Sequence, residues 1–460
     1  MKKYGLVAGL AVILIAGVLV WRWLVRSNDN MASSLPQGVT MVARIDARQA
    51  MSEYGISWAE LTQLLLSDKE STGIDPMKVG YLFAWNNYLG AILPLTNADD
   101  FEQYLLRHSH TTQEQRGIRW SVIDGRQIVG YTDDRAILMG PALGTELDNL
   151  RNTIAQCLQQ KETNSGTQER LFKRLQERTE PIALATDLSS LAAIPWVGEK
   201  LQPYIDQPLE VSAGLNIKKD KLTLSIALSS DDAKMNKWLD IIDEILKPVN
   251  ANLLRTSPTH PAFHIEMGMR GESLLSFLRT MPEVRAKLLI VNTIFDADLL
   301  LRNIDGDVSV TVPRIELFDT PVPVMQMELR DASFMDNVAD WNDEFSQAAG
   351  VRFVPTNTQQ GWVEMKERKP VYYSLSDHRF VLSESQKLAW ATGYHDVEIS
   401  DAKRMTDCCV YATLNLGNIM LLRGFIDRSQ EIRLMSSSVR QWQMEVPTEG
   451  LAGIMKLLSM

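Results

Sequence analysis

The chain repeats one local pattern three times: an apolar strand, a polar cap and an amphipathic helix. Apolar or alternating runs at Gly90–Leu95, Leu222–Leu228 and Val324–Leu329 predict the strands. Short polar side chains that can cap a helix follow each run: Asn97, Asp99 and Asp100, then Ser230, Asp231 and Asp232, then Asp331 and Ser333. Apolar residues at helical spacing begin at Phe101, Trp238 and Phe334. This pattern predicts a mixed fold in which helices cover sheets.

The surroundings of the first and third copies also match, which indicates an internal duplication. Matching segments lie roughly 220 to 245 residues apart: Met41–Asp46 with Phe263–Met269, Gly117–Val122 with Gly350–Phe353, Tyr131–Leu138 with Tyr373–Leu382, and Pro181–Leu188 with Cys409–Leu416. Hairpin dipeptides such as Asp124-Gly125 favour antiparallel sheets, with helices expected on one face. We predict an α+β fold with two related modules, residues 39–250 and 258–460. Chance similarity between antiparallel meanders is the alternative.

The N-terminus holds an apolar segment long enough to cross a membrane. Gly5–Val25 has 21 residues and, as a helix, would reach roughly 30 Å. Trp21 and Trp23 suit a membrane interface. A cleavable signal peptide would need a shorter apolar core and a small-residue cleavage site after it. We therefore predict that residues 1–26 are an uncleaved anchor helix, which binds the lipid bilayer through Gly5–Val25, and that residues 27–38 are a polar linker.

The charge and the cysteine content of the chain bear on its location, on its class of partner and on its disulfide bonds. Basic side chains flank the apolar segment evenly, but a short tail before a large following domain favours export of that domain. We expect a single-pass membrane protein with its bulk extracytoplasmic, in the periplasm if the cell has two membranes. The net charge of −10 argues against nucleic acid as a partner. Cys157, Cys408 and Cys409 cannot form a disulfide scaffold; a long-range bridge from Cys157 and buried free thiols both remain open.

The sequence lacks the motifs that mark the common enzyme classes. No nucleophile elbow, phosphate loop, dinucleotide fingerprint or zinc-protease helix occurs. The best metal candidates are His260, His264 and Glu266, whose spacing places them on one face of a strand. Pro261 interrupts regular geometry there, so we interpret them as exposed polar residues at a strand end. We expect no cofactor.

Other polar clusters are interpreted as structural. Asp305-Gly306-Asp307 could attract calcium, but its position between apolar runs favours a hairpin turn. Asp133-Asp134 predicts another turn, and His108-Ser-His110 predicts the capped end of a helix. The polar run 159–170 predicts a mobile loop, and the aperiodic segment Asn250–Pro261 predicts the boundary between modules.

Two further segments carry a family resemblance. Leu35–Asp46 is a proline-led opening strand, and Gly73-Ile-Asp-Pro-Met-Lys-Val-Gly80 follows the next helix. This arrangement resembles a Bacteroidetes cell-envelope family of unknown function, a duplicated α+β domain found mostly in lipoproteins. The resemblance covers most of residues 35–450 and implies an envelope location without assigning catalytic residues. The family's lipidated cysteine is absent, because no cysteine follows the apolar segment.

Two functional hypotheses follow. The first is a membrane-anchored extracytoplasmic envelope protein with a non-catalytic role, binding or scaffolding a protein or glycan partner. The second is an envelope hydrolase whose active site is built from scattered carboxylates. A deep pocket with convergent acids and a raised carboxyl pKa would favour the hydrolase, and a grooved surface would favour binding. We favour the non-catalytic role.

Overall fold

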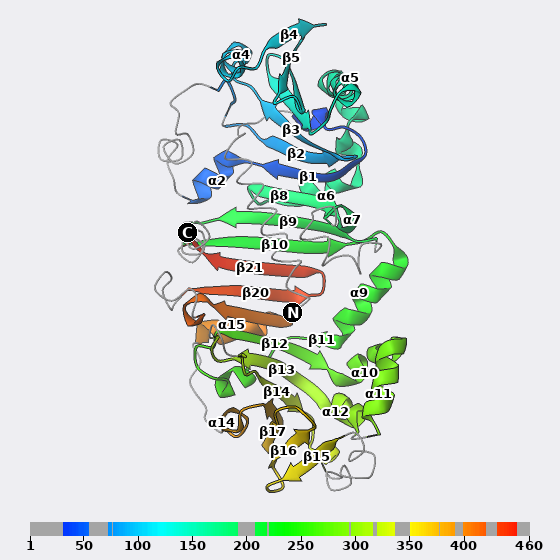
Figure 1. Ribbon diagram of the computed structural model, residues 1–460, viewed down its shortest axis with the longest axis vertical. Helices are drawn as coiled ribbons and strands as arrows, with labels where there is room; N and C mark the ends of the chain where they lie inside the picture. The colour runs from blue at the N-terminus through cyan, green and yellow to red at the C-terminus, as the bar shows by residue number, and fades with distance from the viewer. Residues whose placement is uncertain are drawn as a thin grey trace. The chain divides into compact units, whose positions relative to one another are not determined.

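The structure is a computed structural model of the whole chain (Figure 1). It describes residues 31–54, 72–75, 77–191, 208–218, 220–293, 296–315, 320–335, 350–376, 378–391, 399–419 and 430–448. The predicted membrane segment Gly5–Val25 lies outside these residues. Within them, no helix combines the length and the apolar character needed to cross a membrane.

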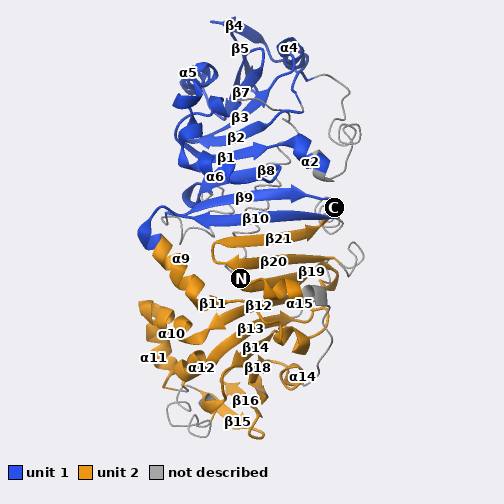
Figure 2. Ribbon diagram, turned by 180° about the vertical axis from the view of Figure 1, so that it is seen from behind, with its two compact units in different colours: residues 1–235 blue, residues 236–460 orange. Residues whose placement is uncertain are grey.

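The chain divides into two compact units, Met1–Met235 and Asn236–Met460 (Figure 2). The division falls inside helix α9 (Ala233–Ile245) and not in the segment Asn250–Pro261. Within that segment Ala251 and Leu253 are buried in unit 2, as is Val249 just before it.

Unit 1 is built on an antiparallel sheet. Its strands pair in the order β4 (Thr112–Gln115), β5 (Ile118–Ile123), β6 (Gln127–Tyr131), β7 (Arg135–Gly140), β3 (Tyr88–Pro94), β2 (Gly80–Trp85), β1 (Val39–Ile45), β8 (Ile182–Asp187), β9 (Glu210–Ile217) and β10 (Lys221–Ser229). Its described helical segments are η1 (Met31–Ser34), α2 (Ala47–Tyr54), α4 (Ala98–Arg107), α5 (Thr145–Gln159), η2 (Glu162–Asn164), η3 (Gly166–Gln168), α6 (Arg170–Gln176) and α7 (Leu188–Leu191).

Helices cover both faces of the unit 1 sheet. Helices α5 and α6 pack on the face that carries Val42 and Ile92, and α4 packs on the face that carries Ala91. The expectation of helices on one face is therefore wrong for this unit. The physical reason is that β3, β7 and β8 are apolar at successive positions, so neither face can be left in water.

Unit 2 repeats the strand order of unit 1. Its strands pair as β15 (Val351–Pro355), β16 (Gln360–Met365), β17 (Val371–Ser376), β18 (Arg379–Ser383), β14 (Val324–Leu329), β13 (Ile304–Val312), β12 (Phe263–Arg270), β19 (Val410–Asn415), β20 (Glu431–Ser438) and β21 (Gln441–Pro447), with β11 (Leu246–Lys247) beside the end of β12. Its described helical segments are η5 (Leu253–Thr256), α10 (Gly271–Thr280), α11 (Pro282–Val291), α12 (Ala297–Asn303), η6 (Ser333–Met335), α14 (Gln386–Ala389), α15 (Ile399–Thr406) and η8 (Leu416–Asn418).

Local sequence signals account for several boundaries. Asn97 caps α4 by accepting the N–H groups of Asp99 and Asp100. Asp124 and Gly125 have φ angles of 52° and 67° and form the predicted turn between β5 and β6. The predicted turn at Asp133-Asp134 is also present, between β6 and β7.

Part of the predicted linker and the predicted mobile loop are packed against each other. In residues 31–38, the second part of the predicted linker, Met31 and Leu35 are buried. The polar run 159–170 supplies the partners: Gln160 Nε2 donates to the carbonyls of Ser33 and Leu35 at 2.8 Å each. Polar side chains in this run satisfy buried backbone groups, which composition alone does not reveal.

Candidate functional site

The three metal candidates do not form one site. His260 is exposed in the turn before β12, and its carbonyl accepts a hydrogen bond from Asn418. His264 and Glu266 lie on β12, on one face of the sheet. Among the described residues, no group of three or more His, Cys, Asp or Glu side chains is arranged to hold a metal ion.

His264 and Glu266 are interior residues, so their interpretation as exposed strand-end residues is wrong. Their relative exposures are 1% and 0%. His264 Nε2 lies 3.0 Å from Glu266 Oε2, and His264 Nδ1 lies 2.8 Å from Thr311 Oγ1. β12 lies between β13 and β19, so its backbone is paired on both edges, and its buried face is the one that carries His264 and Glu266.

Asp307 joins this pair from the neighbouring strand. The predicted turn at Asp305-Gly306-Asp307 is wrong, because these residues continue β13 and Asp307 pairs with Gly268. Asp307 is 0% exposed and its carboxyl group is hydrogen-bonded to that of Glu266. Ionised carboxylates can only accept, so this bond requires a proton on one of the two acids.

Burial dominates the electrostatics of the cluster. It raises the pKa of Glu266 to about 7, although the hydrogen bond from Asp307 works against the rise. Burial also raises the pKa of Asp307 to about 8, and the bond to Glu266 and the charges of Glu266 and Glu328 add to it. Burial lowers the pKa of His264 to about 4, so the imidazole is neutral at pH 7. A neutral ring can donate from Nε2 to Glu266 and accept at Nδ1 from Thr311.

A short segment covers the cluster. We call residues 248–257, which include η5, the strap. The backbone N–H groups of Asn250 and Ala251 donate to Asp307 Oδ2 at 2.9 and 3.0 Å. The side-chain amides of Asn250 and Asn252 donate to Glu328 at 2.5 and 3.0 Å. The buried Asp307 and the partly exposed Glu328 therefore bind the strap to the sheet.

The equivalent positions in unit 1 are apolar or aromatic. Helices α2 and α10 begin just after β1 and β12, at Ala47 and Gly271, which aligns Val42 with Glu266. Strand pairing then aligns Tyr81 with Asp307 and Phe83 with Ser309. Val42 and Phe83 belong to the core beneath α5 and α6. The same sheet position thus holds a hydrocarbon core in unit 1 and ionisable groups in unit 2.

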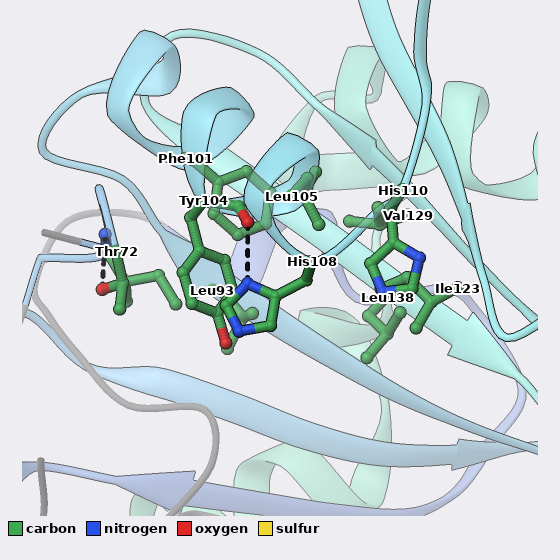
Figure 3. Close-up of a pocket in the computed structure, with 11 residues that line it drawn as sticks. Thr72, Leu93, Phe101, Tyr104, Leu105, His108, His110, Ile123, Val129 and Leu138 are labelled. Carbon is green, nitrogen blue, oxygen red and sulfur yellow. Dashed lines mark hydrogen bonds between the residues drawn. The ribbon is translucent and has the colours of Figure 1, made fainter. Parts of the chain in front are cut away.

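An accessible hollow lies elsewhere, beneath α4 of unit 1. Figure 3 shows it between the end of α4 and the strands, with His108 and His110 at its edge. Its volume is about 70 Å³, and its walls are mainly apolar, including Leu93, Phe101 and Leu138. His108 Nδ1 lies 2.9 Å from the carbonyl of Tyr104, so this histidine caps the helix as predicted. No carboxylate lines the hollow.

The three cysteines are free thiols. Burial raises the pKa of Cys157 to about 12, which makes its thiolate inaccessible at neutral pH. Cys408 is also buried, and Cys409 is partly exposed. Burial is the main cause of the raised pKa of Cys408 and of Cys409, and the lowering by Arg270 at Cys409 does not offset it.

A family match covers most of the chain. Residues 53–423 match the domain of unknown function DUF4836. This protein belongs to the DUF4836 family. The match confirms the expected membership of a family of unknown function, while Bacteroidetes origin and lipid attachment stay predictions.

Other comparisons add little to the DUF4836 assignment. None of the curated proteins matches the sequence. Crystal forms IV and III of TP0453 are similar at 10% identity and a TM-score of 0.30, covering 47% of this chain and 85% and 86% of TP0453. Crystal form I gives 8% identity and a TM-score of 0.27, with 45% and 82% covered. Similarity at this level does not define a shared fold or activity.

Sequence reasoning missed Asp307, Glu328 and the asparagines of the strap. A signal was available in this DUF4836 chain: polar residues occupy alternate positions in three consecutive apolar strands. They are His264 and Glu266, then Asp307, Ser309 and Thr311, then Gln326 and Glu328. Alternation of this kind usually marks a face that is exposed to solvent. Here the strap covers the polar face, so these residues are buried.

Proposed function

We propose that this DUF4836 protein is a membrane-anchored extracytoplasmic envelope protein with a non-catalytic binding or scaffolding role. Residues 1–26 would anchor it in the bilayer through Gly5–Val25, with the bulk of the chain in the periplasm of a cell with two membranes. The shared strand order of the two units supports an origin by duplication. An envelope protein or glycan is the partner class we infer.

The observation that carries this proposal is the burial of the chemical groups. His264, Glu266 and Asp307 are at most 1% exposed, and each is bonded to the sheet or to the strap. An acid or base must reach within hydrogen-bond distance of its substrate to act on it. These groups therefore serve the fold of unit 2, which supports a role outside catalysis.

The hollow beneath α4 supports the same role. Binding sites combine apolar walls with a few polar groups at the edge, as this hollow does with His108 and His110. Its lining offers no pair of carboxylates, which a glycoside hydrolase requires. Its small volume fits a single aliphatic or aromatic group of a larger partner.

One observation favours the alternative, an envelope hydrolase. The raised pKa values of Glu266 and Asp307 are typical of a general acid. Such a hydrolase would need the strap to leave the sheet before a substrate could approach. The two functions therefore differ in a measurable way, because only the hydrolase depends on the chemistry of Glu266.

Chemical crosslinking in intact membranes, followed by capture of the full-length chain, tests the binding role. We expect a defined envelope protein or glycan whose capture falls in a His108→Ala, His110→Ala double variant. Gln103→Ala, an exposed change on the same helix, is the matched control and should leave capture unchanged. Loss of the partner in the control as well, or turnover of envelope glycan that Glu266→Gln abolishes, would contradict the proposal.

A further inference from the structure

Carboxyl groups hold residues 250–252 of the strap over the sheet, and neutral hydrogen bonds hold its two ends. The Val249 N–H donates to the carbonyl of Cys408, and Thr256 and Ser257 bond to Gln326. Asp307 receives the N–H groups of Asn250 and Ala251, and Glu328 receives both asparagine side chains. Ala251 has a φ angle of 63°, a left-handed conformation that is unfavourable for alanine. Its N–H bond to Asp307 therefore stabilises a backbone that would relax if the strap were free.

The geometry beneath the strap requires a bound proton. Glu266 and Asp307 are diagonal neighbours on one face of β12 and β13, because Glu266 pairs with Ser309 and Asp307 pairs with Gly268, and both are fully buried. Among the described residues, no N–H or hydroxyl donor reaches Glu266 Oε1, and the buried Ser309 Oγ beside it has no hydrogen-bond partner. Only a carboxyl proton can join the two acids. Without it, two negative charges would share an interior that excludes water.

The surrounding charges do not replace that proton. His264 shares the face from β12, but it is a neutral ring already bonded to Glu266 and Thr311. Glu328 adds negative charge from β14. The remaining charged groups of the neighbouring elements form ion pairs or are exposed. Lys247 and Arg330 both pair with Asp305, Arg433 pairs with Glu431, and Arg404 pairs with Glu445. Arg255 of the strap is exposed.

We propose that the Glu266–Asp307 pair is a proton-operated latch that holds the strap closed over unit 2. Loss of the shared proton leaves two adjacent buried carboxylates. They can be hydrated only if the strap lifts, because the sheet lies on their other side. The strap then opens and exposes the polar face of β12, β13 and β14. The latch is independent of the proposed binding role.

The raised pKa values place the transition near neutrality. The pKa of about 7 for Glu266 and about 8 for Asp307 predict a closed strap below pH 7 and an open one above pH 8. Both are ordinary pH values for a cell envelope, so opening requires no denaturing condition.

Hydrogen exchange of the full-length protein between pH 6.5 and 9, corrected for intrinsic exchange, tests the latch. We expect protection of peptides spanning 249–257 to fall at least about tenfold across this range. Residues 31–35 of unit 1 are the internal control, because the amide of Gln160 holds the carbonyls of Ser33 and Leu35 without a carboxyl group. Their protection should not change with pH.

Two substitutions separate the latch from simple loss of stability. Glu266→Gln replaces the shared proton with a permanent N–H donor to Asp307 and keeps an acceptor for His264. It should hold the strap closed to pH 9. Asp307→Asn keeps one acceptor oxygen for the two backbone donors, which both use Oδ2 in the parent chain, and its amide can donate to Glu266, so it should also hold the strap closed to pH 9. Glu364→Gln, an exposed change on β16, should behave as the parent chain.

Two outcomes would overturn the latch. One is constant protection of 249–257 in the parent chain from pH 6.5 to 9. The other is a Glu266→Gln protein that is folded yet loses protection at the same pH as the parent.

Discussion

At the scale of single residues, the unusual feature of unit 2 is a buried polar cluster at sheet positions where unit 1 has a hydrocarbon core. Val42 and Phe83 contribute to stability by leaving water. Glu266 and Ser309 occupy the equivalent positions, and Glu266 is favourable only while its partners are present. Burying polar groups is tolerated when each is paired, and it becomes costly when one partner is removed.

Truncating Glu266 should therefore destabilise unit 2 far more than an isosteric change. Glu266→Ala leaves His264 and Asp307 without their partner and should lower the free energy of unfolding by about 3–5 kcal/mol. Glu266→Gln keeps both hydrogen bonds and should stay within about 1 kcal/mol of the parent chain at pH 7. Denaturant unfolding, followed by hydrogen exchange of the amides in β12 and β13, measures the change in the free energy of unfolding for each variant.

The control for this comparison is Glu364→Ala. Glu364 is exposed and pairs with Arg352 at 3.6 Å, so its loss should cost no more than about 0.5 kcal/mol. Equal effects of Glu266→Ala and Glu364→Ala would mean that the buried cluster does not contribute as described.

At the scale of elements, caps and turns follow from sequence where their chemistry is local. Asn97, Asp124-Gly125 and Asp133-Asp134 all act within a few residues of themselves, and the structure places them as predicted. Asp305-Gly306-Asp307 has the same composition but forms a strand. Its outcome depends on the backbone donors of Asn250 and Ala251, more than fifty positions away in sequence. Local patterns cannot contain that information.

The N-cap of α4 provides a test at this scale. Asn97 Oδ1 accepts the N–H of Asp99 at 2.9 Å and that of Asp100 at 3.3 Å. Asn97→Ala should lower the stability of unit 1 by about 1 kcal/mol, measured by denaturant unfolding with exchange in α4 peptides. Asn149→Ala, the same change inside α5 at an exposed position, should be neutral or slightly stabilising. A neutral Asn97→Ala would contradict the assigned cap.

At the scale of the whole molecule, unit 2 repeats the strand order of unit 1, but the side chains in the interiors of the two units differ in kind. The repeated strands were detectable in sequence because apolar alternation and turn residues recur. The meander match was displaced by one strand, since Gly117–Val122 lies on β5 while Gly350–Phe353 enters β15, the counterpart of β4. The buried acids of unit 2 could not be found in this way, because sequence periodicity does not show which face the strap covers.

The two interiors should respond differently to pH. Glu266 and Asp307 have raised pKa values, so the folded state binds protons that the unfolded chain has lost, and stability falls as pH rises. His264 has a lowered pKa and acts in the opposite direction between about pH 4 and 6.5. The stability of unit 2 should therefore fall most steeply between pH 6.5 and 8, by up to about 1.4 kcal/mol per pH unit for each proton released.

Denaturant unfolding from pH 5 to 9, followed by exchange in strands of each unit, checks this dependence. In unit 1 the buried acid Glu210 and its neighbour Asp187 are paired with Arg170 and Arg174, so this unit should show a weaker slope over the same range. Stability of unit 2 that rises from pH 6.5 to 8 would have the wrong sign for this account.

The most direct test of the central claim is to detect the buried proton itself. Infrared spectroscopy distinguishes the carbonyl band of a protonated carboxylic acid from that of a carboxylate. We predict such a band in the parent chain at pH 6.5, its loss between pH 7 and 9, and its absence from Glu266→Gln at every pH in that range. A parent chain without the band at pH 6.5, or a folded Glu266→Gln protein that retains it, would contradict a shared proton in unit 2.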